Sequence, residues 1–212
     1  MRVTAAGPVT ANASTVSAWN LANYLTVLRL VLVPVFLVLL LGRDGQDDGW
    51  RIGATLVFAV ASYTDRIDGQ IARARGLVTS FGKLMDPIAD KALTGAALIG
   101  LSLLDELPWW LTVVVLLREV GVTLLRFFVI RHGVMPASRG GKLKTLLQGL
   151  AIGLYLLPLA GLAASSRAPV MALAVLVTVV TGVDYVARAV TLRRTSARAD
   201  LKRARRAVRA RR

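Results

Sequence analysis

The chain alternates between long apolar stretches and short polar breaks. Six stretches carry few charges and run for roughly 20 residues, the length that a helix needs to cross a bilayer. They cover residues 21–41, 52–74, 84–104, 109–130, 146–164 and 169–192. The breaks cover residues 42–45, 73–83, 105–108, 131–144 and 165–167. This pattern predicts an all-α integral membrane protein with six transmembrane helices.

Composition supports a membrane protein and excludes several chemistries. The chain has 212 residues, of which 55% are hydrophobic, whereas a soluble domain of this length carries more polar surface. It contains no cysteine, which excludes disulfides, thiolate metal sites and cysteine nucleophiles. The single histidine, His132, lies in a basic break, so a histidine-based triad or a histidine-rich zinc site is excluded as well.

The distribution of positive charge predicts the topology. Six crossings would place both termini on one side of the membrane. That side would carry 18 of the 27 lysines and arginines, and the opposite side would carry three. Because cytoplasmic loops are enriched in lysine and arginine, we expect both termini in the cytoplasm and a multi-pass protein of the cell membrane.

The two ends of the chain differ from its apolar middle. Residues 1–19 lack the pattern of a signal peptide and are interpreted as a disordered or surface-lying segment. Residues 20–192 form the predicted six-helix membrane domain, and residues 193–212 form a basic cytoplasmic tail. We interpret this tail first as a solvated topology signal; a basic tail beside a membrane helix would also be attracted to anionic lipid. It lacks interleaved aromatic residues, so we expect no nucleic-acid partner.

Four aspartates lie in the second and third apolar stretches, at Asp65, Asp68, Asp86 and Asp90. Carboxylates are costly near a bilayer, so acids there indicate a functional site. The first two are spaced i,i+3 and the last two i,i+4, so each pair shares one face of a helix. Converging from two helices, the four acids would form an oxygen cage suited to Mg²⁺ or Mn²⁺. Two such ions would clamp a diphosphate, and a carboxylate could take the proton of an incoming hydroxyl.

Basic residues also occur inside the predicted spans, where charges normally face a bundle interior or a wet cavity. Arg66 and Lys91 neighbour the aspartates and would either neutralise them or extend to the membrane surface. Arg118 and Arg126 are eight residues apart, about two helical turns, and therefore share a face of one helix. They predict a cationic pocket open to the cytoplasm, for which a phosphate is the natural ligand. The predicted pocket residues are Arg118, Arg126, Arg139, Lys142 and Lys144.

The acidic segment has a distinctive spacing, D-x2-D-G-x2-A-R-x8-G-x3-D-x3-D from Asp65 to Asp90. It resembles the signature of the CDP-alcohol phosphotransferases at every fixed position. The resemblance implies the CDP-alcohol phosphotransferase fold, with six membrane helices, and displacement of CMP from a CDP-linked substrate with two divalent metal ions, Mg²⁺ or Mn²⁺. It further implies that Asp65 and Asp86 contact both ions, Asp68 the first and Asp90 the second. Asp90 would also be the catalytic base for the acceptor hydroxyl.

Two more stretches resemble the phosphatidylglycerophosphate synthases of that family. Residues 20–29 are similar to an N-x-x-N-x-L-T-x-x-R opening, with Ala22 where proline is usual. The second is Arg118-Glu119 through Arg126, followed by residues 141–148. The resemblance covers residues 20–190 and neither tail. It implies that the basic residues bind the phosphate of the acceptor and that CDP-diacylglycerol is contacted by Asn23, Thr26, Gly69, Arg73 and Thr79.

The resemblance therefore implies a transferase of phospholipid biosynthesis. CDP-diacylglycerol and sn-glycerol 3-phosphate would give phosphatidylglycerophosphate and CMP, by direct displacement without a covalent enzyme intermediate. The active site would face the cytoplasm. This fold is often dimeric, so the resemblance leaves a homodimer open.

Other readings of the same residues stay open. The acceptor could be phosphatidylglycerol, as in a cardiolipin synthase, or inositol phosphate, because all share the aspartates. The basic residues favour a phosphorylated acceptor, and the Gly-Lys-x-Lys-Thr segment at 141–145 favours glycerol phosphate. From another class, a cation transporter could use buried acids as its pathway. No internal repeat is evident, which argues against a transporter built from inverted halves.

Overall fold

A computed structural model describes the backbone of residues 21–74, 80–129 and 139–209, and the side chains of 24–64, 85, 88–125, 141 and 143–192. The elements are α1 (Leu21–Leu41), the 3₁₀ turn η1 (Gly42–Gly45), α2 (Asp48–Ala74), α3 (Ser80–Leu103), α4 (Trp109–Val129), α5 (Arg139–Leu156), α6 (Gly161–Ser165) and α7 (Arg167–Arg209). No strand occurs within these ranges, so the prediction of an all-α protein is confirmed.

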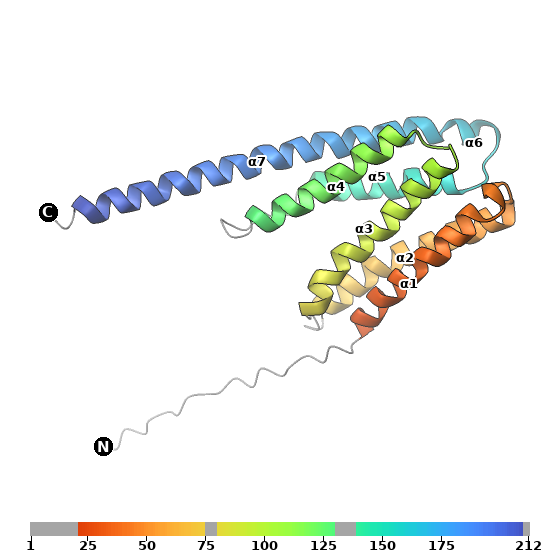
Figure 1. The fold of residues 1–212 in the computed structure, drawn as a ribbon, viewed down its shortest axis with the longest axis horizontal. Helices are drawn as coiled ribbons and strands as arrows, with labels where there is room; N and C mark the ends of the chain where they lie inside the picture. Colours follow the sequence, from red (N-terminus) through yellow and green to blue (C-terminus); the bar gives the residue numbers. More distant parts are fainter. Residues whose placement is uncertain (1–20, 75–79, 130–138, 210–212) are drawn as a thin grey trace, which may run out of the picture.

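The helices pack as two groups that share one bundle (Figure 1). In one group α1 packs against α2 and α3, and in the other α7 packs against α4 and α5. Contacts of α3 with α4, and of α5 with α2 and α3, join the groups. The connections from α1 to α2, from α3 to α4 and from α5 to α6 lie at the same end of the bundle, here called the turn end (Figure 1).

Local chemistry explains how the chain reverses at the turn end. Between α1 and α2, Arg43, Asp44 and Gly45 all have positive φ, with values of 53°, 56° and 67°. Aspartate and glycine tolerate this left-handed region better than most residues. Asp47 then caps α2, because its Oδ1 accepts a hydrogen bond from the backbone N–H of Trp50 at 3.1 Å. The polar break at residues 42–45 is therefore a true helix boundary.

An ion pair between Arg51 and Glu106 connects the chain segments at the turn end, and we call it the turn-end cluster. Arg51 lies in the first turn of α2 and is 8% exposed. In the sequence it is one of the three basic residues predicted on the side of the membrane opposite to the termini. Its guanidinium donates to both carboxylate oxygens of Glu106, which lies between α3 and α4. It also donates to the backbone carbonyls of Gly45, Tyr155 and Leu156. One arginine thus links three connections of the bundle.

The second half of the chain departs from the predicted spans. The expectation of one continuous helix over approximately residues 146–164 is wrong, because α5 ends at Leu156 and a separate short helix covers Gly161–Ser165. Pro158 lies in the gap, and proline has no N–H to continue a helix. The helix α5 already begins at Arg139, within the predicted break at 131–144, and α7 continues to Arg209. Lysine, arginine and alanine are good helix formers, so an apolar pattern underestimates the length of α7.

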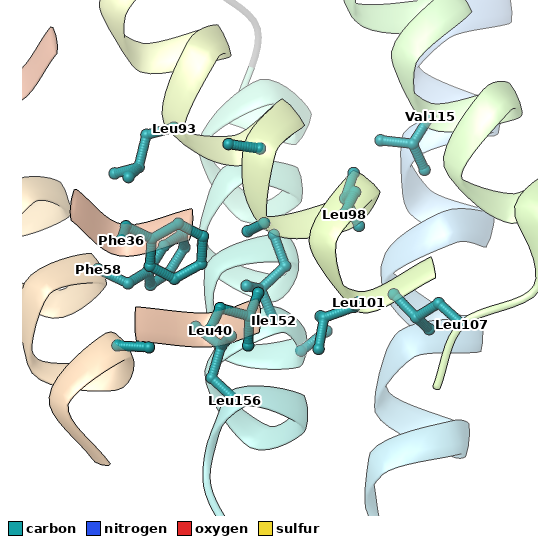
Figure 2. Packing of buried hydrophobic residues seen from close by; sticks show 14 of the residues in the cluster. Phe36, Leu40, Phe58, Leu93, Leu98, Leu101, Leu107, Val115, Ile152 and Leu156 are labelled. Atoms are coloured by element: carbon teal, nitrogen blue, oxygen red, sulfur yellow. The ribbon is translucent and has the colours of Figure 1, made fainter. Parts of the chain in front are cut away.

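The core lies where the two groups meet (Figure 2). Phe36 of α1 and Phe58 of α2 have ring centroids 5.8 Å apart. Leu98 of α3 and Ile152 of α5 are fully buried in the same cluster. Glycine permits close contact of α1 and α3, since a Cβ at Gly100 would lie 2.6 Å from a methyl group of Leu40. These contacts hold α3 in register with its neighbours.

The outer surface of the bundle is apolar. Leucines and valines stay exposed on several helices, including Val38, Leu117 and Leu176, which are 64%, 69% and 59% exposed. Two of the described helical segments, residues 24–45 and 161–192, are long and apolar enough to cross a membrane. Large contiguous apolar surface is unfavourable in water, and a bilayer would cover it. The structure thus indicates a membrane protein.

Candidate active site

The backbone brings the four aspartates of the sequence motif onto two helices of one group. Asp65 and Asp68 lie on α2, and Asp86 and Asp90 lie on α3. Asp65 and Asp86 are equally far along their helices from the turn end, so the two pairs lie at similar depth. The side chains of Asp65, Asp68 and Asp86 lie outside the described residues, and that of Asp90 is exposed. The assignment of all four as metal ligands therefore stays a prediction.

The face of α1 that approaches this region is polar and buried. Thr26 and Arg29 are each 1% exposed, although they lie in an apolar helix. The Nε of Arg29 donates to the backbone carbonyl of Ala61 at 3.3 Å, and Ala61 is one turn before Asp65 on α2. Arg29 is the arginine that ends the N-x-x-N-x-L-T-x-x-R stretch of the sequence, although it was not among the predicted site residues. The other residues predicted to contact CDP-diacylglycerol lie outside the residues whose contacts the structure describes: Asn23, Gly69, Arg73 and Thr79.

Three cations from three helices surround one carboxylate, and we call this group the Glu119 cluster. Glu119 of α4 accepts a hydrogen bond from Lys91 of α3 at 2.9 Å, between Nζ and Oε2. Its other oxygen, Oε1, accepts from Lys144 of α5 and, at 3.1 Å, from Nη1 of Arg118. The side chains of Arg118, Glu119 and Lys144 are 15%, 12% and 8% exposed. Together the four ionised groups carry a net charge of about +2 in a partly desolvated place.

Arg118 is also held by the helix on its other side. Its Nε donates to the carbonyl of Thr178 at 3.1 Å, and its Nη2 donates to Oγ1 of Thr181 at 2.9 Å. The next residue of α7, Gly182, leaves the space that Arg118 occupies, since a Cβ there would lie 3.0 Å from Cγ of Arg118. The guanidinium is thus fixed by α4 and α7 together.

Lys91 corrects one prediction. The sequence assigned this residue to the neighbouring aspartates or to the membrane surface, whereas its described ion pair is with Glu119. Asp90 itself is exposed, and the side chains of Asp65, Asp68 and Asp86 lie outside the described residues. Lys91 therefore connects the helix of the aspartates to the basic helices.

The predicted phosphate pocket is described in part. The structure brings Arg118 and Lys144 to the same carboxylate. Arg126 lies further along α4, and Arg139 and Lys142 begin α5, but their side chains lie outside the described residues.

Two residues of this region were not among the predicted site residues. Glu119 lies in a predicted membrane span next to Arg118, and this acid could have been recognised because charges in spans normally face a bundle interior. Gln148 is 5% exposed, and neither its amide oxygen nor its amide nitrogen has a partner within the described part of the chain. Buried polar groups are normally hydrogen-bonded, so this amide is exceptional.

Comparison with known proteins identifies relatives over most of the chain. A protein of Mycobacterium tuberculosis (strain H37Rv) named probable phosphatidylglycerophosphate synthase is 59% identical over 170 residues, 80% of this chain and 81% of the relative. A CDP-diacylglycerol–glycerol-3-phosphate 3-phosphatidyltransferase of Bacillus subtilis (strain 168) is 40% identical over 149 residues, 66% of this chain and 77% of the relative. A CMP-forming cardiolipin synthase of Streptomyces coelicolor is 38% identical over 120 residues, 55% of this chain and 54% of the relative.

The family model described as CDP-alcohol phosphatidyltransferase matches residues 19–180, which include the four aspartates and the Glu119 cluster. The chain belongs to the CDP-alcohol phosphatidyltransferase family.

Proposed function

We propose that this protein transfers the phosphatidyl group of CDP-diacylglycerol to sn-glycerol 3-phosphate, giving phosphatidylglycerophosphate and CMP. Relatives at 59% and 40% identity are named for this reaction. The structural observation that carries the choice of acceptor is the Glu119 cluster. Three cations around one carboxylate leave positive charge for a phosphorylated acceptor, and Lys91 adjoins Asp90 on the aspartate helix.

The chemistry needs a base and a means of stabilising a diphosphate. Four carboxylates on two neighbouring helices are the donor set that Mg²⁺ or Mn²⁺ prefers, so Asp65, Asp68, Asp86 and Asp90 would hold two such ions. Bound there, the ions would offset the negative charge that develops on the diphosphate. Asp90 would take the proton of the acceptor hydroxyl as its oxygen attacks the lipid-linked phosphorus. The bond to CMP then breaks, and CMP leaves.

The same proposal includes the membrane arrangement. The excess of basic residues on one side favours both termini, and the active site, in the cytoplasm. Six apolar stretches favour a multi-pass protein. A soluble acceptor and a lipid-anchored donor would then meet at the cytoplasmic ends of α2 and α3, away from the turn end.

A reconstituted assay tests this function. Purified protein in vesicles is given Mg²⁺, CDP-diacylglycerol and, separately, glycerol 3-phosphate, phosphatidylglycerol or inositol phosphate, and CMP release is measured. We expect CMP with glycerol 3-phosphate. No CMP with any acceptor, together with cation flux across the vesicles, would favour a transporter instead.

Substitution of the proposed base is the sharpest internal test. Asp90→Asn should lower turnover by about 10²-fold or more, while nucleotide binding is largely kept. Asp184→Asn is the matched control, because Asp184 is exposed on α7 and pairs with Arg188 one turn later. Equal turnover of the Asp90→Asn variant and the wild type would remove Asp90 from the role of base.

Cardiolipin synthesis is the second candidate, because the Streptomyces coelicolor relative carries that name. Its acceptor would be phosphatidylglycerol, a phosphodiester with one negative charge. CMP release with phosphatidylglycerol alone would establish it.

A further inference from the structure

The cations of the Glu119 cluster keep hydrogen-bonding capacity for a ligand. A lysine ammonium has three N–H donors and a guanidinium has five. The described bonds use one donor each on Lys91 and Lys144 and three on Arg118, which leaves about two on each residue. These donors come from α3, α4 and α5. A tetrahedral anion with several acceptor oxygens could accept from all three helices while Glu119 keeps its own bonds.

Unpartnered buried polar atoms border the same cluster. Gln148 is one turn after Lys144 on α5, so the two side chains share a face, and its amide has no partner among the described groups. Thr178, whose carbonyl accepts from Arg118, has a buried hydroxyl that is likewise unpartnered there. Leaving such buried groups without a hydrogen-bond partner is unfavourable. A ligand with hydroxyl groups beside its phosphate would satisfy them.

Glu119 also sets where such a ligand lies relative to the aspartates. Without a carboxylate between them, Lys91, Arg118 and Lys144 would repel one another and move apart. With it, α3 is tied to α4 and α5 at the residue next to Asp90. The distance between the anion and the proposed base is then fixed by packed helices and not by flexible loops.

We propose that Glu119 is a positioning residue that holds Lys91, Arg118 and Lys144 as one anion-binding unit, with Gln148 beside it to receive a hydroxyl of the acceptor. The inference rests on the proposed transfer to a phosphorylated acceptor. Glu119 remains bound to the cations while the acceptor is present and does not exchange with it. Removing the carboxylate should therefore weaken acceptor binding, although it increases the positive charge of the pocket.

The test compares Glu119→Gln, Glu119→Asp and the wild type in detergent and in vesicles. For Glu119→Gln we expect the KM for glycerol 3-phosphate to rise at least tenfold, with the KM for CDP-diacylglycerol within twofold of the wild type. Glu119→Asp keeps the charge on a shorter side chain and should fall between the two. Binding is measured separately, as the rise in melting temperature that glycerol 3-phosphate causes without CDP-diacylglycerol. That rise should be lost in Glu119→Gln.

The outcomes separate the inference from the proposed function. An acceptor KM in Glu119→Gln equal to or below that of the wild type overturns the inference, as does a lower melting temperature with unchanged acceptor KM. If Glu119→Gln does not fold, the decision passes to Glu119→Asp, where an unchanged acceptor KM overturns it. If the wild type releases no CMP with any acceptor, the proposed function fails. The thermal shift by glycerol 3-phosphate then still decides whether Glu119 organises an anion site.

Discussion

The molecule contains two arginine–glutamate clusters, which differ in the hydrogen-bond donors and the positive charge that they leave unpaired. In the turn-end cluster, Arg51 and Glu106 balance in charge, and the guanidinium also donates to three backbone carbonyls. In the Glu119 cluster, three cations share one carboxylate, and donors remain on each cation. The turn-end cluster is balanced within the protein and serves the structure. The Glu119 cluster has the excess positive charge and the hydrogen-bond donors that a ligand requires.

The difference shows how to separate structural from functional charge in this bundle. Both clusters are partly buried and both join several helices, so burial alone does not distinguish them. What distinguishes them is whether the donors and charges are already matched within the protein. Substitutions in the turn-end cluster should change stability, and substitutions in the Glu119 cluster should change the use of the acceptor.

The largest effect is expected at the turn end. Arg51→Met leaves the Glu106 carboxylate without its cation, and such losses cost about 3–5 kcal/mol when the pair is buried. We expect a clear fall in melting temperature, measured in detergent, with kcat and both KM values of the folded enzyme unchanged. Arg43→Met is the control, because the Arg43 side chain is 69% exposed and should change stability by less than about 0.5 kcal/mol. Equal losses in the two variants would contradict the structural role of Arg51.

Arg118→Ala should produce the opposite pattern. Hydrogen bonds to charged groups contribute about 1.5–3 kcal/mol, so we expect kcat/KM for glycerol 3-phosphate to fall roughly 10- to 100-fold. The loss should appear mainly as a higher acceptor KM in steady-state assays. Arg188→Ala removes an exposed arginine of α7 and should have little effect. An unchanged acceptor KM in Arg118→Ala would remove this residue from the acceptor pocket.

Gln148→Met should stabilise the protein but weaken its use of the acceptor. It replaces a buried, unpartnered amide by an apolar side chain of similar length, so the free energy of unfolding should rise by about 1 kcal/mol. The acceptor KM should rise severalfold, because a hydroxyl partner is lost. Gln46→Met, at an exposed position, should change neither quantity. A less stable variant with normal acceptor KM would show that Gln148 serves the fold alone.

The smallest effect is expected from Gly182→Ala. The new methyl group would lie 3.0 Å from Cγ and 3.3 Å from Nε of Arg118, so the arginine must shift by a few tenths of an ångström. We expect the acceptor KM to rise by roughly threefold, since a small displacement of the guanidinium weakens its contact with the acceptor. Gly121→Ala on α4 is the control, because a Cβ there meets nothing within 4 Å. Identical kinetics of the two variants would mean that Arg118 adapts without loss.

The fold could be predicted best where the sequence marks its helix ends. The break at residues 42–45 and the one at 105–108 were predicted from polar residues, glycine and proline, and both separate helices in the structure. The prediction failed around Pro158, because an apolar stretch long enough to span a membrane hid an interruption. It also failed at Arg139, because a segment with charged residues and two glycines looks like a loop in an apolar pattern, although it begins α5.

The candidate site could be predicted by residue type but not by pairing. Arg118 and Lys144 were predicted as pocket residues from their charge inside or beside an apolar stretch, and they do meet. Lys91 was predicted to neutralise the neighbouring aspartates or to extend to the membrane surface, whereas its described ion pair is with Glu119 of another helix. Glu119 was missed as a site residue, because its role arises from cations on three separate helices.

By itself the sequence determined that this is an all-α chain with an apolar surface, a spaced set of four aspartates, and the family to which it belongs. These properties depend on composition, periodicity and local spacing, which a chain carries before it folds. Only the tertiary structure decided which charges are balanced and which are left for a ligand. Ion pairing depends on distances between helices, and Lys91, Glu119 and Lys144 come within hydrogen-bonding distance only after α3, α4 and α5 have packed.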